Sequence, residues 1–247
     1  MAMNCIRHAA FLGCFCLSAN LPIAIAQDTA LIQSTMSEFV DGKIDQASVK
    51  TAIDDLLLKA ANTKEKGDLL LRVLSSLSKD IPGTSQMVLA YASEAASLPL
   101  SPKDLSQVNI YLGNAFEADA HKAAGKAESR ELKLKALAAY LQAFKVISSK
   151  LSAKERSPLP SVSKFDYDGP TTDPQYIALE QQHAAEVARR LAVETQNSLI
   201  TQGEVVDSRI RELSRETKLT PEEREKITGQ GGFTESQLDA LSKLLSQ

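Results

Sequence analysis

The stretch ALAAYLQAFKV, residues 136–146, decides the fold class of this chain. Its apolar side chains recur every three or four positions, as the buried face of one α-helix requires. The same spacing continues through most of the 247 residues, and glycine and proline are sparse inside the periodic segments. We therefore predict an all-α protein of about nine or ten helices, arranged as antiparallel hairpins.

Three helix starts stand out on either side of this stretch. Ser101 and Asp173 each precede a proline, which places a capping side chain directly before a residue suited to the first helical position. The segment Thr220–Glu223 adds a glutamate at the third helical position, which is typical of a capping box. These signals predict helices that begin at residues 102, 174 and 221.

The composition changes at SPLPSVSKFDYDGPTTDP, residues 157–174, which has four prolines and no helical period. Such a segment is typical of a loop or linker. We therefore predict a Pro-rich linker over residues 157–173. It would separate a hairpin domain over residues 27–156 from a C-terminal helical region over residues 174–247.

The N-terminus has the pattern of a secretory signal peptide. Arg7 precedes an apolar run, which ends in Ala24-Ile25-Ala26 before Gln27. A basic start, an apolar middle and small residues at the cleavage site predict cleavage after Ala26 and export to the periplasm or beyond. Retention as a membrane anchor and lipid attachment at Cys14 are the alternatives.

Composition excludes several kinds of site from the mature chain. All three cysteines lie before the predicted cleavage site, at Cys5, Cys14 and Cys16. Without them the mature chain has no disulfide, no thiolate metal site and no cysteine nucleophile. The net charge is −3 without a basic block, which argues against nucleic-acid binding. Beyond the N-terminus we expect no membrane span.

Residues 105–151 resemble a tetratricopeptide-repeat hairpin. Six residues match that family's pattern: Leu112, Gly113 and Phe116 in the first helix, and Ala136, Tyr140 and Ala143 in the second. Asn109 departs from it, because the family has tryptophan there, and a generic amphipathic hairpin is the alternative. The resemblance implies that the six residues pack the two helices together, in a short repeat array followed by a C-terminal helical segment.

The same resemblance implies a surface that binds a peptide or another protein. Polar positions that we expect to be exposed on the first helix are the candidate contact residues: Gln107, Asn109 and Asn114. No nucleophile elbow, phosphate-binding loop or dinucleotide fingerprint is present in the sequence. We therefore predict a non-catalytic binding scaffold of the cell envelope without a cofactor. A hydrolase that uses two carboxylates leaves no local motif and stays open.

A metal-binding bundle is the alternative function. Glu180 and His183 have the E-x-x-H spacing of di-metal helical bundles, and Glu117 lies one helical turn before His121. These four residues would form a site if their helices packed together. Otherwise they are solvated polar residues on alanine-rich helices.

The helix predicted near residues 174–217 mixes arginines with acidic residues, including Arg189, Arg190 and Arg209. We interpret this mixture as a solvated face with ion pairs inside the helix. Pairing with a partner helix is the alternative.

Overall fold

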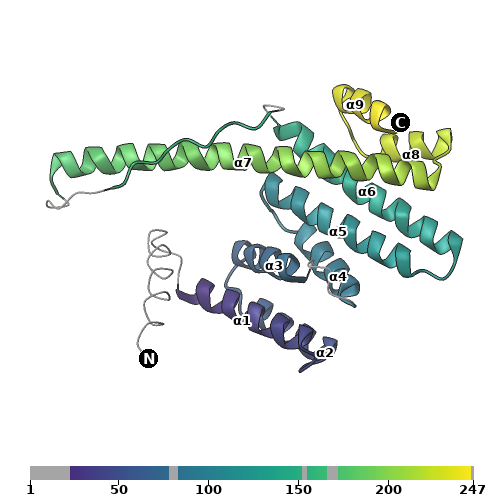
Figure 1. The fold of residues 1–247 in the computed structure, drawn as a ribbon, viewed down its shortest axis with the longest axis horizontal. Coiled ribbons are helices and arrows are strands. Elements are labelled where there is room, and N and C mark those ends of the chain that lie inside the picture. Colours follow the sequence, from purple (N-terminus) through teal and green to yellow (C-terminus); the bar gives the residue numbers. More distant parts are fainter. Residues whose placement is uncertain (1–22, 78–82, 152–154, 166–171, 246–247) are drawn as a thin grey trace, which may run out of the picture. The chain divides into compact units, whose positions relative to one another are not determined.

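The computed structural model describes residues 23–77, 83–151, 155–165 and 172–245. Helices and connecting segments account for these ranges, which contain no strand, so the prediction of an all-α fold is confirmed (Figure 1). Residues 1–22, with the three cysteines, lie outside the description, and the predicted cleavage site falls in the first turn of α1. Among the helices described, none combines the length and apolar character needed to cross a membrane.

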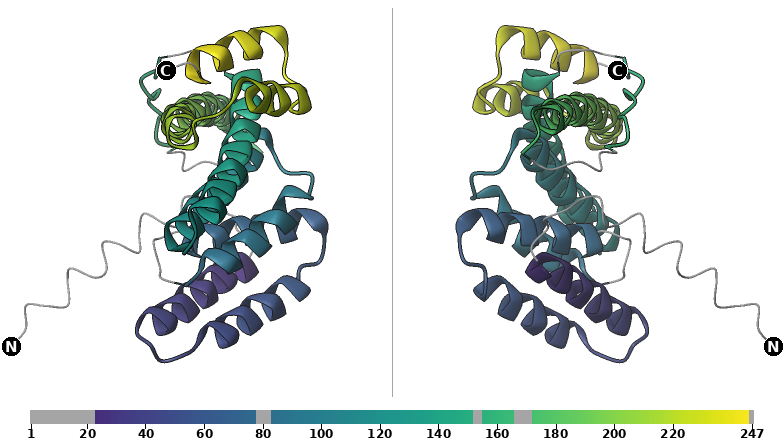
Figure 2. Two further views of the ribbon diagram at one scale, coloured as in Figure 1. Left: turned by 90° about the vertical axis from the view of Figure 1, so that its right-hand side faces the viewer. Right: turned by 90° about the vertical axis from the view of Figure 1, so that its left-hand side faces the viewer.

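The chain divides into two compact units, residues 1–81 and residues 82–247. The first unit contains three helices, which pack against one another (purple in Figure 2): α1 (Ile23–Val40), α2 (Gln46–Leu58) and α3 (Thr63–Leu77). Asp45 caps α2 by accepting a hydrogen bond from the Ser48 amide at 2.8 Å. The α3 residues Leu70 and Val73 are fully buried in the core of this unit.

The second unit contains six of the described helices, listed here in chain order: α4 (Ser85–Ala96), α5 (Pro102–Lys122), α6 (Lys126–Lys150), α7 (Pro174–Thr217), α8 (Pro221–Gln230) and α9 (Glu235–Leu245). The predicted starts at residues 102, 174 and 221 are confirmed. Ser101 and Asp173 cap α5 and α7, and Thr220 forms the predicted capping box with Glu223.

The core of the second unit lies around α6, which packs against both α5 and α7. Its residues come from helices on both sides of the Pro-rich segment: α6 supplies Leu137, Tyr140, Leu141 and Phe144, α7 supplies Val206, Ile210 and Leu213, and α9 supplies Leu241, Leu244 and Leu245. The predicted domain boundary at residues 157–173 is therefore not where the chain divides. A single core continues across that segment, because the buried face of α7 packs against α6.

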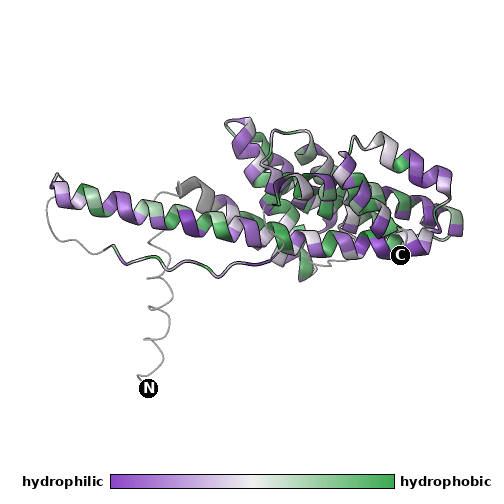
Figure 3. Ribbon diagram, turned by 90° about the horizontal axis from the view of Figure 1, so that it is seen from above, coloured by the Kyte–Doolittle hydropathy of each residue, from purple (hydrophilic) through white to green (hydrophobic). Residues whose placement is uncertain are grey.

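The helix α7 is continuous for 44 residues, and Gly203 does not interrupt it. Its two halves have different environments. All its buried residues lie from Leu199 onward, and none lies between Pro174 and Ser198. The first half therefore extends beyond the packed core of its unit, and apolar patches continue along it (Figure 3).

Candidate functional site

The first half of α7 is accompanied by the segment of residues 155–165, which we call the strap. The strap lies extended along α7 and runs in the opposite direction (Figure 1). The Ser157 amide donates to Asn197 Oδ1 at 3.0 Å, and Asn197 Nδ2 donates to the Ser157 carbonyl at 2.8 Å. Nearer the packed core, Arg156 forms an ion pair with Glu204. We call the strap together with residues 174–198 the arm.

The register of the strap follows from backbone geometry. From Ser157 to Ser163 the strap advances six residues, while its contacts on α7 move eleven residues, from Asn197 to Glu186. An extended polyproline-type chain rises about 3.1 Å per residue and an α-helix 1.5 Å, so the two spans match at about 18 Å. Pro158 and Pro160 favour this extended backbone and cannot continue a helix.

Two contacts fix the outer end of the strap. The Phe165 ring meets Tyr176 and His183 edge-on, with ring centroids 5.3 and 5.7 Å apart. Both the hydroxyl and the amide of Ser163 donate to Glu186 Oε2, at 2.5 and 2.8 Å. These bonds favour the charged carboxylate and lower the pKa of Glu186 to about 2. At neutral pH the strap is therefore held by an ionised acceptor.

The arm also carries much of the exposed apolar surface. Ten large apolar side chains are exposed in the described residues, and five belong to the arm: Leu159, Phe165, Ile177, Leu179 and Leu191. Leu191 is 55% exposed. Large apolar side chains gathered on one projecting element are typical of an interaction surface. The chemistry that this arrangement supports is therefore apolar contact with another molecule.

A polar cluster lies between α5, α6 and α7, apart from the arm. The Tyr140 hydroxyl donates to Asn114 Oδ1 at 2.6 Å and lies 3.2 Å from Glu117 Oε2. Arg209 Nε lies 3.8 Å from the same carboxylate. Burial raises the pKa of Glu117, and Arg209 opposes that shift. Because these groups already serve as one another's partners, we assign this cluster to packing rather than to ligand binding.

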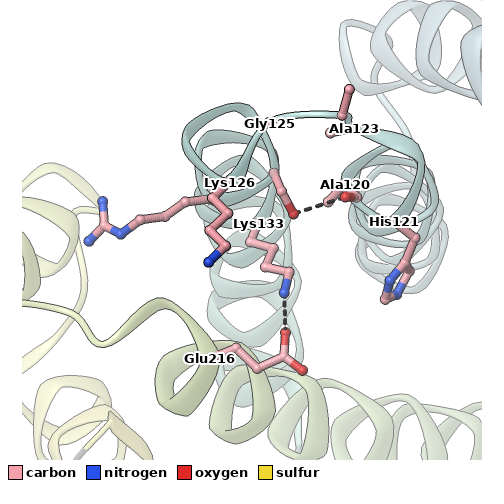
Figure 4. Close-up of a pocket in the computed structure, with 10 residues that line it drawn as sticks. Ala120, His121, Ala123, Gly125, Lys126, Lys133 and Glu216 are labelled. Atoms are coloured by element: carbon pink, nitrogen blue, oxygen red, sulfur yellow. Dashed lines mark hydrogen bonds and ion pairs between the residues drawn. The ribbon is translucent and has the colours of Figure 1, made fainter.

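A cavity of about 470 Å³ lies at the turn between α5 and α6 (Figure 4). Lys133 Nζ lies 2.8 Å from Glu216 Oε2 at its edge, and His121 and Lys126 also line it. Arg130, another lining residue, binds both carboxylate oxygens of Glu223 at 2.8 and 2.9 Å. Much of the positive charge here is therefore already paired within the protein.

The predicted contact residues have three different environments. Asn114 is exposed but accepts the Tyr140 hydroxyl, and Gln107 accepts a hydrogen bond from Gln202 at 2.9 Å. Asn109 is only 9% exposed and donates to the Leu105 carbonyl, so the expectation that it is exposed is wrong. Its position on α5 is therefore turned away from solvent.

The six residues predicted to pack α5 against α6 lie at or near that interface. Ala136, Tyr140 and Ala143 are buried, and Phe116 packs against the same core. Leu112 is half-buried. A Cβ atom on Gly113 would lie 2.5 Å from Tyr140 Cζ, so glycine is required where the ring meets α5.

The alternative metal site is not assembled, and that prediction is corrected. Glu117 lies beside Arg209, whereas His183 is 26 residues before Arg209 on the same helix. At 1.5 Å per residue this separation is about 39 Å. Across the described ranges, no three His, Cys, Asp or Glu side chains are placed to hold a metal ion. The E-x-x-H spacing places Glu180 and His183 on one helix but does not bring them near Glu117, and His183 contacts Phe165.

The interpretation of α7 as a helix with internal ion pairs is confirmed at two places. Arg190 Nε lies 3.0 Å from Glu194, and Arg209 Nη1 lies 2.8 Å from Glu212. Sequence reasoning missed the strap, which it interpreted as a linker. The available signal was the proline at every second position in Pro158-Leu159-Pro160, which favours an extended segment. Comparison with protein-family models, curated proteins and solved structures finds no match.

Proposed function

We propose that this chain is an exported, non-catalytic helical protein that binds another protein through its arm, as a scaffold of the cell envelope. The observation that carries the proposal is the exposed apolar surface of the arm, centred on Ile177 and Leu191. A helix of this length needs an apolar partner for most of its stability in water. The strap covers one side of the helix, and a partner would cover the other.

The strap also supports the proposal energetically. Binding to a flexible segment loses free energy because the segment must be ordered first. Bonds from Ser157 and Ser163, with the Phe165 ring contacts, hold the arm in place before any partner arrives. A preordered arm can therefore use its apolar contacts for affinity.

Export is proposed from the N-terminal pattern that ends at Ala26. The resemblance of α5 and α6 to a tetratricopeptide repeat stays a prediction. A repeat there would add a second binding surface to the scaffold without altering the role proposed for the arm.

The test is photo-crosslinking of the full chain in its own cells. A photoreactive amino acid replaces Leu191, and the matched control places it at Leu238, which is 38% exposed on α9. We expect protein adducts from position 191 and few from position 238. Absence of adducts at position 191 in a folded, exported chain would overturn the proposal, and so would equal labelling from both positions.

A further inference from the structure

A cavity of about 610 Å³ lies along the second half of α7, apart from the arm. Its volume is in the range of cavities that hold small molecules. The described residues that line it are all polar or charged: Glu204, Asp207, Ser208, Arg211, Glu212 and Arg215. At about 100° per residue, most of these positions lie on the side of α7 away from Val206 and Ile210, which are buried in the core. The cavity is therefore suited to a polar ligand.

Two of the charged groups in this cavity have the spacing of an ion pair but do not form one. Asp207 lies four residues before Arg211, an arrangement that normally brings a carboxylate and a guanidinium together on a helix. Earlier on the same helix, Arg190 and Glu194 have this spacing and are joined at 3.0 Å. Within the described ranges Asp207 has no hydrogen-bond or ion-pair partner. The two opposite charges are therefore close to each other but not paired.

Both groups are also partly withdrawn from water. Burial raises the pKa of Asp207, and the nearby charge of Arg211 opposes that rise. The Nε atom of Arg211 is buried, and the described part of the chain offers it no hydrogen-bond partner. Withdrawing such groups from water without a partner costs free energy, so their presence together in a cavity is typical of a binding site. The carboxylate lacks a donor, and the guanidinium lacks an acceptor.

We propose that this cavity binds a free amino acid. The α-carboxylate of the ligand accepts hydrogen bonds from the Arg211 guanidinium, whose planar fork matches a carboxylate, and the α-ammonium group donates to the Asp207 carboxylate. The Cβ atoms of residues four apart on a helix lie about 5–6 Å from each other, so one small molecule that carries both charges reaches both side chains. The cavity lies outside the arm, and the inference does not rest on the proposed function.

An amino acid fits this cavity better than a simple ion does. An anion alone would leave Asp207 without a donor, and a cation alone would leave Arg211 without an acceptor. The other two acids of the lining, Glu204 and Glu212, are already paired with arginines that do not line the cavity. Because the lining side chains are polar, we expect serine, glutamine and lysine to bind more tightly than leucine and phenylalanine.

Isothermal titration calorimetry of the purified full chain tests the ligand class, with these five free amino acids as probes. For the one that binds most tightly, the N-acetyl derivative removes the ammonium charge and the carboxamide removes the carboxylate charge. Each derivative should bind at least about tenfold more weakly, because it loses a charge-assisted hydrogen bond. Absence of binding by all five at millimolar concentration would overturn the inference, and so would equal binding of either derivative.

Asp207→Asn and Arg211→Gln test the two residues, and Glu194→Gln is the matched control. Glu194 lies on the same helix outside the cavity and is paired with Arg190. Each test variant should weaken binding by about ten- to a hundredfold, and the control should leave it unchanged. Binding that survives both test substitutions, or that Glu194→Gln weakens equally, would overturn the inference.

Urea unfolding separates ligand binding from a structural role of Asp207. Because its carboxylate is partly buried and unpaired, Asp207→Asn should leave the urea midpoint of the ligand-free chain unchanged or raised. A saturating amino acid should raise the midpoint of the wild type but not that of this variant. A lower midpoint of Asp207→Asn without ligand would mean that the carboxylate stabilises the fold, and it would overturn the assignment.

Discussion

Gly113 allows the ring of Tyr140 to lie directly against α5. A Cβ atom at this position would lie 2.5 to 2.8 Å from three ring carbons, and the Tyr140 hydroxyl is held by Asn114. The ring therefore cannot move away without losing a partly buried hydrogen bond. This residue fixes the distance between the two helices at the centre of the second unit.

We expect Gly113→Ala to destabilise the protein by about 1–3 kcal/mol, because the added methyl group overpacks the Tyr140 ring. Urea unfolding followed by circular dichroism measures this loss. Gly229→Ala is the matched control, since Gly229 also lies in a helix but has open space around its Cα. The control should be neutral or stabilising by up to about 1 kcal/mol. Equal effects of the two substitutions would contradict the assigned packing.

Glu117 predicts a specific pH dependence. Its pKa is raised in the folded state by burial, against the opposing effect of Arg209. The folded protein therefore binds this proton more tightly than the unfolded chain, and the associated stability is lost as pH rises through the raised pKa. As pH rises from about 4 to about 7, we expect the free energy of unfolding of Glu117→Gln to increase relative to that of the wild type.

The control is Glu131→Gln, because the Lys135 side chain at 2.8 Å lowers the pKa of Glu131. This variant should lose stability relative to wild type over the same rise in pH. Urea unfolding at the two pH values measures both variants. The same direction of change in both would show that the environment assigned to Glu117 is wrong.

At the scale of elements, the arm depends on the bond between the strap and α7 at Glu186. The pKa of Glu186, about 2, means that the folded state favours the carboxylate. The stability that this provides is present above about pH 4.5. The attachment weakens as pH falls from that value toward 2. Ser157, bound to Asn197, is a separate point of attachment farther along the strap.

We expect Glu186→Gln to speed hydrogen exchange at the Ser163 amide, because that amide loses its charged acceptor. Exchange at the Ser157 amide should change much less. Mass spectrometry or NMR of the full chain measures both sites. Unchanged protection at Ser163 would mean that the strap does not depend on this bond.

Local signals were sufficient to predict most elements. The caps at Ser101, Asp173 and Thr220 predicted three helix starts correctly, because capping depends on residues within one turn. The strap could not be predicted, because its structure depends on Asn197 and Glu186, which follow it by 40 and 23 residues. The burial of Asn109 was missed for a similar reason: it depends on tertiary packing around α5, which local spacing does not determine.

At the scale of the whole molecule, the predicted processing of the N-terminus has a direct test. We expect the exported chain to begin at Gln27 and to contain no cysteine, since all three cysteines precede that residue. Intact mass spectrometry before and after iodoacetamide treatment measures both properties. Alkylation of the exported chain, or a mass that includes a lipid at Cys14, would contradict cleavage after Ala26.

Domain organisation was the level at which sequence was least informative. The prolines of residues 157–165 indicated correctly that no helix forms there, but not that α7 returns to the core of α6. Apolar periodicity identifies buried faces without identifying which faces meet. The metal set failed in the same way, because spacing within α5 and within α7 does not determine how far apart His121 and His183 lie.

The two-to-one register between strap and helix constrains how this protein can vary in length. One residue removed from the strap shortens it by about as much as two residues shorten α7. A deletion in either segment alone would shift Ser157, Ser163 and Phe165 out of step with Asn197, Glu186 and His183. Insertions and deletions in the arm of natural variants should therefore occur as paired events, with about two helix residues for each strap residue.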